Sequence, residues 1–182
     1  VWYAGANSLN VSGNGGGVPW LFISQPKRYW VGGGSSNTWN AVGPSNWSTT
    51  SGVIEDASVP TTSDNVFFDT NSGTGNSVVS ANISIRSLNT TGYIGTITHN
   101  SAVTISIGDE NPGENNIALK FGSGMTYTLN NLATSALQFI STSATTQTID
   151  WGGKTSGNVT FNATTNGVWK YLSTHTFSTS AT

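Results

Sequence analysis

Val79-Ser-Ala-Asn-Ile-Ser-Ile85 and Val103-Thr-Ile-Ser-Ile107 are the two stretches that decide the fold of this chain. In both of them, apolar residues occupy every second position. This alternation is typical of β-strands buried on one face, because successive side chains of a strand point to opposite faces of the sheet. The same pattern recurs later in the pairs Tyr127 and Leu129, Leu137 and Phe139, Val159 and Phe161, and Trp169 and Tyr171.

These candidate strands are separated by Gly and Asn residues and return at a regular interval. Strand centres near residues 84, 105 and 128 lie roughly 20 residues apart, which is the spacing expected of β-solenoid coils. No extended helical periodicity interrupts them. We therefore predict an all-β protein with a β-solenoid body resembling a parallel β-helix, and we keep a β-sandwich as the alternative.

The composition fits a solenoid. Ser, Thr, Asn and Gly make up about half of the 182 residues, and only 8% of the residues are charged. In stacked coils the inward positions favour Val, Ile, Leu and Phe, whereas the outward positions carry polar side chains that form ladders along the stack. Aromatic residues account for 10% of the chain and include seven Trp, which argues against disorder.

Three segments are expected along the chain. Residues 1–28 form an irregular attachment or linker segment, and residues 29–76 form a compact, Trp-rich β cap. Residues 77–182 hold the solenoid coils, which we expect to continue beyond this piece of the polypeptide. The cap is expected to cover the open end of the solenoid, because unpaired strand edges invite aggregation.

Charge and cysteine content exclude several classes of function. The formal net charge is −2 and the six Lys and Arg residues are scattered, whereas nucleic-acid binding needs clustered cations. No run of about 18 apolar residues is present to span a membrane. The chain has no Cys, so disulfides, thiol catalysis and zinc–thiolate sites are excluded together. We expect neither a nucleic-acid partner nor membrane insertion.

A series of short motifs runs in a fixed order through residues 28–172. They are Arg28-Tyr-Trp-Val-Gly-Gly33, Asn46-Trp-Ser48, Thr50-Ser-Gly52, Ala57-Ser-Val-Pro60, Asp64-Asn-Val-Phe-Phe-Asp69, Ser87-Leu88, Thr91-Gly92, Gly122-Ser-Gly-Met-Thr-Tyr127, Gly153-Lys-Thr155 and Asn158-Val-Thr-Phe-Asn162. The series resembles a repeat of tail-fibre and other structural proteins of marine bacteriophages, which some bacterial surface proteins also carry. The resemblance implies a β-helical virion or cell-surface protein and no defined catalytic residues.

Half of the acidic residues lie close together in the sequence: Glu55, Asp56, Asp64 and Asp69. Loops rich in carboxylates can hold Ca²⁺, which takes six to eight oxygen ligands. No EF-hand spacing accompanies them, and ordinary turn formation explains the same residues equally. Calcium is therefore the one cofactor that the sequence leaves open. A second acidic group, Asp109-Glu110 with Glu114, is interpreted as a solvated turn.

We predict no catalytic residues. His99 and His175 stand alone in the sequence, and nothing ties Arg86 to an acid. A glycoside hydrolase generally needs two carboxylates on either side of the sugar. The Trp residues are interpreted mainly as core or interface residues, with Trp151 and Trp169 assigned to the core of the coils, although flat indole faces also suit sugar rings. The sequence does not identify glycan-binding residues.

The apolar run that includes Trp20, Leu21, Phe22 and Ile23 is the candidate subunit interface, because it would be a sticky patch if exposed. We expect a homo-oligomer, most simply a trimer. The first functional hypothesis is a structural and adhesive virion component in a phage tail, which binds other tail proteins and host-surface polysaccharide. The alternative is a bacterial surface adhesin or extracellular filament subunit, and the third hypothesis is a glycan-degrading spike enzyme.

Overall fold

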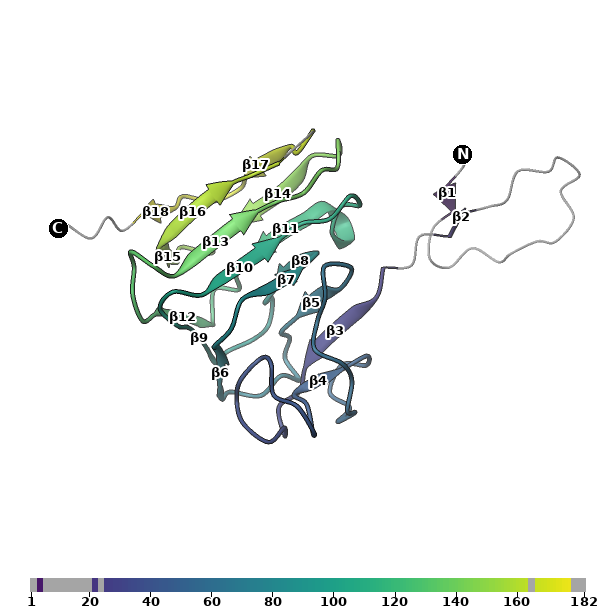
Figure 1. Cartoon of the computed structure of the whole chain (residues 1–182), viewed down its shortest axis with the longest axis vertical. Coiled ribbons are helices and arrows are strands. Elements are labelled where there is room, and N and C mark those ends of the chain that lie inside the picture. Colours follow the sequence, from purple (N-terminus) through teal and green to yellow (C-terminus); the bar gives the residue numbers. More distant parts are fainter. Residues whose placement is uncertain (1–2, 5–20, 23–24, 164–165, 178–182) are drawn as a thin grey trace, which may run out of the picture.

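The computed structural model describes residues 3–4, 21–22, 25–163 and 166–177 of the chain. Most of these residues wind into stacked coils, and the complete coils contribute one strand to each of three parallel sheets (Figure 1). The four-stranded sheet consists of β7 (Ile83–Ile85), β10 (Thr104–Ile107), β13 (Ala136–Phe139) and β16 (Asn158–Phe161). The three-stranded sheet consists of β6 (Asn76–Val79), β9 (Thr96–His99) and β12 (Thr126–Leu129).

The seven-stranded sheet runs through the whole stack. Its strands in spatial order are β17 (Trp169–Tyr171), β14 (Gln147–Asp150), β11 (Ile117–Lys120), β8 (Ser87–Asn89), β5 (Asn65–Phe67), β3 (Lys27–Trp30) and β4 (Trp47–Ser48). Two further parallel pairs are short: β15 (Thr155–Ser156) with β18 (Thr176–Phe177), and β1 (Tyr3–Ala4) with β2 (Leu21–Phe22). The sheet is continuous across residue 76, where the cap was expected to give way to the coils.

Every strand pairing in the described residues is parallel except that of β3 with β4. Parallel stacking of strands from successive coils confirms the predicted β-solenoid, since a sandwich would be built from antiparallel sheets. The one helical element in this part of the chain is the short 3-10 turn η1 (Glu114–Asn116). No helix among the described residues is long and apolar enough to cross a bilayer.

The core is built from ladders of aligned apolar side chains, one from each coil. Val66, Leu88, Leu119 and Ile149 pair in register through four strands of the seven-stranded sheet, and none is more than 1% exposed. Burying such a side chain contributes about 1.5–3 kcal/mol to stability. These four residues lie outside the alternating stretches noted in the sequence. Within those stretches, Ile85, Ile107 and Phe139 pair in register and are fully buried.

The coils differ in length, which the sequence interpretation missed. Twenty-two residues separate Ile83 from its partner Ile105, but 32 separate Ile105 from Leu137, and 22 separate Leu137 from Val159. The predicted strand centre near residue 128 is in a strand, but Thr128 pairs with Thr98 in the three-stranded sheet and does not stack on β10. The extra residues lie in loops between strands, where additional length adds little to the closure entropy.

Polar ladders run along the outer surface, as predicted. The Thr98 hydroxyl donates to Asn76 Oδ1 at 2.8 Å, and the Asn130 amide donates to Asn100 Oδ1 at 2.7 Å. Each of these bonds joins side chains of successive coils. The solvent-facing positions therefore help to align the coils without needing charge.

An aromatic cluster closes the N-terminal end of the described stack. Trp30, Trp39, Trp47 and Phe68 are at most 5% exposed, and their ring centroids lie 5.2–5.9 Å apart. Trp47 also donates its indole N–H to the Trp39 carbonyl oxygen at 2.7 Å. The antiparallel strand β4 contributes Trp47 to this cluster and ends the seven-stranded sheet, at the bottom of Figure 1.

Candidate functional site

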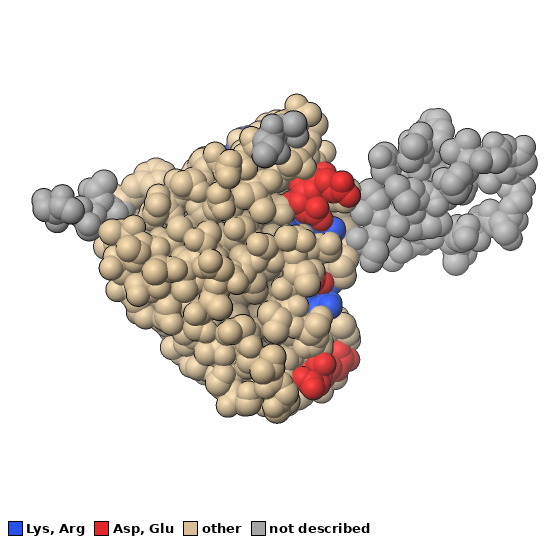
Figure 2. All heavy atoms as spheres, in the orientation of Figure 1, with Lys and Arg blue, Asp and Glu red and all other residues tan. Residues whose placement is uncertain are grey.

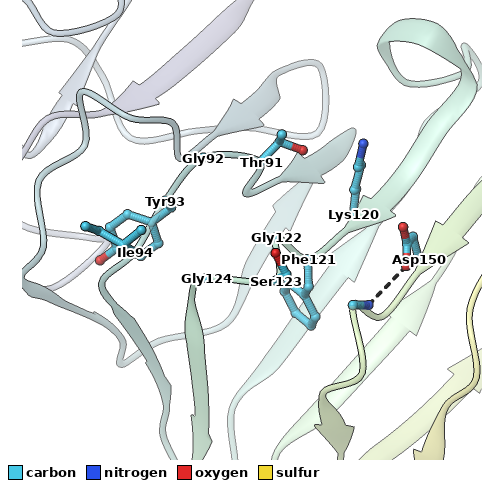
Figure 3. Close-up of a pocket in the computed structure, with 11 residues that line it drawn as sticks. Thr91, Gly92, Tyr93, Ile94, Lys120, Phe121, Gly122, Ser123, Gly124 and Asp150 are labelled. Carbon is cyan, nitrogen blue, oxygen red and sulfur yellow. Dashed lines mark hydrogen bonds between the residues drawn. The ribbon is translucent and has the colours of Figure 1, made fainter.

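A groove with a volume of about 460 Å³ lies where three successive coils turn after strands β8, β11 and β14 (Figure 3). The stacked turns comprise residues 90–95, 121–125 and 151–154, and they come from sequence positions about 30 residues apart. Neighbouring strands in a sheet are about 4.8 Å apart, so the two steps between these turns span about 10 Å. The groove thus follows the long direction of the stack.

Two glycines at equivalent positions allow the turns to stack closely. Gly122 and Gly152 each lie two residues after the paired strand residues Lys120 and Asp150. A Cβ atom on Gly122 would lie 2.4 Å from the Thr90 carbonyl oxygen, and one on Gly152 would lie 2.3 Å from the Phe121 carbonyl oxygen. A side chain at either position would collide with the backbone of the preceding coil. Much of the groove wall is therefore backbone.

One lysine and one aspartate stand side by side at the groove. Lys120 and Asp150 are paired residues on the neighbouring strands β11 and β14, and both are half-buried (Figure 3). Asp150 Oδ1 accepts a hydrogen bond from the Gly152 amide at 3.0 Å. Within the described part of the chain, the Lys120 ammonium makes neither a hydrogen bond nor an ion pair. It is therefore free to interact with a ligand.

The two aromatic residues of the groove do not present their rings to it. Tyr93 is 1% exposed and Phe121 is 2% exposed. The Tyr93 hydroxyl donates to the Gly75 carbonyl oxygen at 2.6 Å, and burial raises the pKa of Tyr93. That hydroxyl therefore keeps its proton and already donates it to a hydrogen bond, so it is not a nucleophile. Ile94, by contrast, is 64% exposed and offers an apolar contact.

These groups define what the groove can bind. Exposed turn backbone and the Ser123 hydroxyl provide hydrogen-bond donors and acceptors. The Thr91 hydroxyl donates to Asn89 Oδ1 at 2.7 Å and is left as an acceptor, and Lys120 and Asp150 add opposite charges at one side. The same turn of each coil supplies the groups, so the backbone donors and acceptors repeat along the stack while the side chains differ. An extended, polar and repetitive ligand matches this arrangement.

Glu55 and Asp56, the first two acidic residues of the candidate calcium site, accept hydrogen bonds from nearby loops. Glu55 Oε2 accepts hydrogen bonds from the Ser48 hydroxyl and from the amide and hydroxyl of Thr49, at 2.6–3.0 Å. The bonds from Thr49 are the main reason that the pKa of Glu55 is lowered. Asp56 Oδ1 accepts from the Ser45 amide at 2.7 Å.

The other two acidic residues have separate partners. Asp64 forms an ion pair with Arg28 at 3.2 Å and accepts from the Thr61 amide and hydroxyl. Asp69 accepts from the Ser51 hydroxyl at 2.6 Å. Among the described residues, no group of three or more Asp, Glu or His side chains is arranged to hold a metal ion. The structure does not bring Glu55, Asp56, Asp64 and Asp69 together into one site.

Arg86 does have an acidic partner, which its sequence context did not reveal. The side chain is 3% exposed, and its Nη2 lies 2.9 Å from Asp109 Oδ2. Asp109 was interpreted as part of a solvated turn, but it balances a buried guanidinium. Two more ion pairs, Lys27–Glu114 and Arg28–Asp64, also join distant segments. In Figure 2 the charged side chains lie along one edge, and the rest of that view is uncharged.

The candidate interface falls largely outside the described residues. Trp20 and Ile23 lie outside them, and Leu21 and Phe22 form β2, which pairs with β1. An oligomer formed through this run therefore stays a prediction.

The tryptophans that the structure describes serve packing. Trp30, Trp39, Trp47 and Trp151 are at most 5% exposed, and Trp169 is partly buried against the core. The assignment of Trp151 and Trp169 to the core of the coils is confirmed.

His99 is a core residue with both ring nitrogens in contact with polar groups. It is fully buried, with Nδ1 2.7 Å from the Tyr127 hydroxyl and Nε2 2.9 Å from the Val103 carbonyl oxygen. Burial raises the pKa of Tyr127, so its hydroxyl keeps the proton and donates to Nδ1. Nε2–H then donates to the carbonyl oxygen, and the imidazole is neutral. His99 is therefore structural.

We expect the protein to lose stability as the pH falls below about 6.5. Burial lowers the pKa of His99 below that ordinary value, against the smaller opposing effect of its bond to Val103, and burial also lowers the pKa of His175. Between the folded and unfolded pKa values the unfolded chain binds more protons, so the free energy of unfolding decreases with decreasing pH. Urea denaturation at a series of pH values measures this slope. His99→Gln keeps the hydrogen-bonding capacity without titrating and should reduce the slope; an unchanged slope would contradict the assignment.

Comparisons with known proteins identified no relative of this chain. The chain matches no family model, and comparison with curated proteins and with solved structures gave no match. The groove itself was not predicted from the sequence. The signal that could have indicated it is the 30-residue spacing of Gly122 and Gly152, which occupy equivalent positions in stacked turns.

Proposed function

We propose that this chain is a structural and adhesive component of a bacteriophage virion, part of a tail fibre or spike, and that it contacts host-surface glycan through the groove. The observation that carries the proposal is the origin of the groove in equivalent turns of three successive coils. The backbone groups of these turns recur along the stack, as sugar units recur along a polysaccharide, whereas the side chains differ from turn to turn. A stack of parallel sheets also provides the stiffness that a fibre segment needs.

The chemistry of the groove suits a glycan with little charge. Backbone amides and hydroxyls exchange hydrogen bonds with sugar hydroxyls, directly or through water. The lining residues Lys120 and Asp150 carry opposite charges, and the Lys154 ammonium beside them donates to the Ser123 carbonyl oxygen at 3.0 Å, so the groove is not strongly charged. Binding should then depend only weakly on salt, because neutral hydrogen bonds are not screened. A steep loss of affinity with added salt would indicate a polyanionic ligand instead.

Filling the groove should weaken glycan binding without unfolding the protein. Gly124 lies in the groove at an ordinary backbone conformation, and a Cβ there would meet the movable Ile94 side chain at 3.2 Å. We expect Gly124→Tyr to weaken binding to surface polysaccharides of the host at least about tenfold, because the added ring occupies the space of the ligand. Glycan arrays followed by calorimetry measure the loss.

Gly75→Tyr is the matched control for this experiment. Gly75 is outside the groove, and nothing lies within 4 Å of a Cβ placed on it. The control should bind like the unsubstituted chain, and circular dichroism should show both variants folded. Equal binding by all three proteins would remove the groove from the proposal.

We further propose that glycan binding is not followed by cleavage. In the described residues the groove contains one carboxylate, Asp150, whereas glycoside hydrolysis generally uses two. Incubation with a bound polysaccharide should leave its chain length unchanged, and shortened products would overturn this part of the proposal.

The location of the protein tests its assignment to a virion. Antibody labelling should mark the tails of phage particles, where the partners would be other tail proteins and further copies of this chain. Labelling confined to the envelope of uninfected bacteria would replace the virion assignment with a surface adhesin or filament subunit.

A further inference from the structure

Four polar residues meet on one face of the seven-stranded sheet, at the start of successive strands. Lys27, the first residue of β3, pairs in register with Asn65, the first residue of β5. Asn65 in turn pairs with Ser87, the first residue of β8. Paired residues of neighbouring strands place their side chains on the same face of a sheet. Glu114, which begins η1 just before β11, completes this polar cluster.

The Asn65 side chain is held by its oxygen. It is fully buried, and its Oδ1 accepts hydrogen bonds from the Ser87 hydroxyl at 2.7 Å and from the Glu114 backbone amide at 2.9 Å. A backbone N–H can only donate, so the atom that faces it is the oxygen and the orientation of the side-chain amide is fixed. Two donors on one carbonyl oxygen stabilise the negative charge that develops there when a nucleophile adds to the carbon.

The nitrogen of the same amide is unpaired. Asn65 Nδ2 is buried and has no hydrogen-bond partner among the described residues. Leaving a buried donor unpaired costs free energy, because the group has lost its water and gained nothing in exchange. A reaction that removes this nitrogen and keeps the carbonyl oxygen would therefore relieve the unfavourable half of the amide.

An amine and a carboxylate lie beside this amide. Lys27 Nζ is 2.9 Å from Oε1 and 2.8 Å from Oε2 of Glu114, and it lies 5.5 Å from the ring centroid of Phe67, two residues after Asn65 on the same face. Glu114 thus contacts both groups: its carboxylate holds the Lys27 ammonium, and its backbone amide holds the Asn65 oxygen. A carboxylate in this position can take a proton from the ammonium and free the lone pair of the nitrogen.

We propose that Lys27 and Asn65 form an isopeptide bond within the folded chain, with Glu114 as the proton carrier. Glu114 accepts one proton from the Lys27 ammonium, and the neutral Nζ adds to Asn65 Cγ. Glu114 then passes its proton to Nδ2, the Cγ–Nδ2 bond breaks, and ammonia leaves. Nζ loses a second proton, which Glu114 transfers to the departing ammonia. The net products are one amide bond and one ammonium ion, so no oxidant or other reactant is needed.

The surroundings of the cluster are compatible with this reaction. Lys27 and Glu114 are only half-buried, so ammonia has a path to solvent and does not accumulate beside the new bond. The bond would join the neighbouring strands β3 and β5 (Figure 1). Tension applied to the chain before Lys27 would then pass directly to Asn65, and residues 28–64 would be shielded from it. The proposal depends neither on the glycan groove nor on the virion assignment.

The mass of the intact, denatured protein tests the bond. We expect the folded, purified chain to be lighter than its sequence by one ammonia molecule. Trypsin cleaves after Arg28 and Arg86, so residues 1–28 and 29–86 should be recovered as one linked species, and fragmentation should locate the bond at Lys27 and Asn65.

Three substitutions assign the roles. Lys27→Arg keeps a positive charge beside Glu114 but removes the amine, so this variant should have its full calculated mass. Glu114→Gln keeps the backbone amide and removes the proton acceptor, so it should slow bond formation at least about tenfold. Lys170→Arg is the matched control, because Lys170 is exposed on β17 and outside the cluster; it should lose ammonia like the unsubstituted chain.

Full calculated mass in the folded, unsubstituted protein would overturn the proposal. Ammonia loss that persists in Lys27→Arg would also overturn it, because it would indicate a succinimide at one of the Asn-Gly pairs, 14–15 or 166–167. Circular dichroism shows whether each variant is folded. If Lys27→Arg does not fold, the peptide map of the unsubstituted chain decides alone: the linked species supports the bond, and separate peptides reject it.

Discussion

Replacing Phe68 by Ala should lower the free energy of unfolding by about 3–5 kcal/mol, as expected for a buried Phe whose removal leaves a cavity. Phe68 is fully buried, and its ring centroid lies 5.0 Å from that of Tyr93 and 5.4 Å from that of Trp39. It therefore joins the aromatic cap to the coil that carries the groove. Urea denaturation followed by tryptophan fluorescence measures the loss of stability. We expect the whole unfolding transition to move to a lower urea concentration.

The adjacent Phe67 is the matched control for Phe68. It is half-buried and faces the other side of the sheet, where it stacks on Tyr29 with ring centroids 5.2 Å apart. We expect Phe67→Ala to cost only about 1 kcal/mol, the usual contribution of a partly exposed aromatic pair. Equal losses from the two substitutions would contradict the opposite orientations of these neighbouring side chains.

Replacing Gly152 by Ala should destabilise the protein by about 2–5 kcal/mol. The residue has φ +54°, a left-handed conformation that costs a non-glycine residue about 1–2 kcal/mol. The new Cβ would also lie 2.3 Å from the Phe121 carbonyl oxygen of the preceding coil. Relieving that contact requires the backbone to shift, and overpacking of this kind adds about 1–3 kcal/mol. Thermal and urea denaturation both measure the effect.

Gly153 separates the two causes. It also has a left-handed conformation, with φ +75°, but nothing lies within 4 Å of a Cβ placed on it. Gly153→Ala should therefore cost only the conformational part, about 1–2 kcal/mol. If both substitutions cost the same, the close approach of the coils adds nothing to the cost of Gly152→Ala. The description of the groove wall as tightly stacked backbone would then need revision.

Several features of the candidate site could not be found from the sequence, because they depend on contacts between distant residues. The partners Arg86 and Asp109 are 23 residues apart, and the coil that joins them has no motif to indicate their pairing. The four acidic residues near the cap are close in sequence, yet hydrogen bonds draw each of them towards a different loop. Closeness in sequence was therefore a poor guide to a shared ligand site.

The alternation of apolar and polar residues identified β7, β10, β12, β13, β16 and β17, because the orientation of successive side chains is a local property of an extended backbone. It did not identify β8, β9, β11 or β14. Only the tertiary structure decided which strands stack. The coils between Ile83, Ile105, Leu137 and Val159 contain 22 or 32 residues, and loop length changes the cost of closing a coil only slightly. Many outward Ser, Thr and Asn residues are interchangeable, so they do not mark the register. The groove depends on that register and was therefore decided by the stacking of the coils.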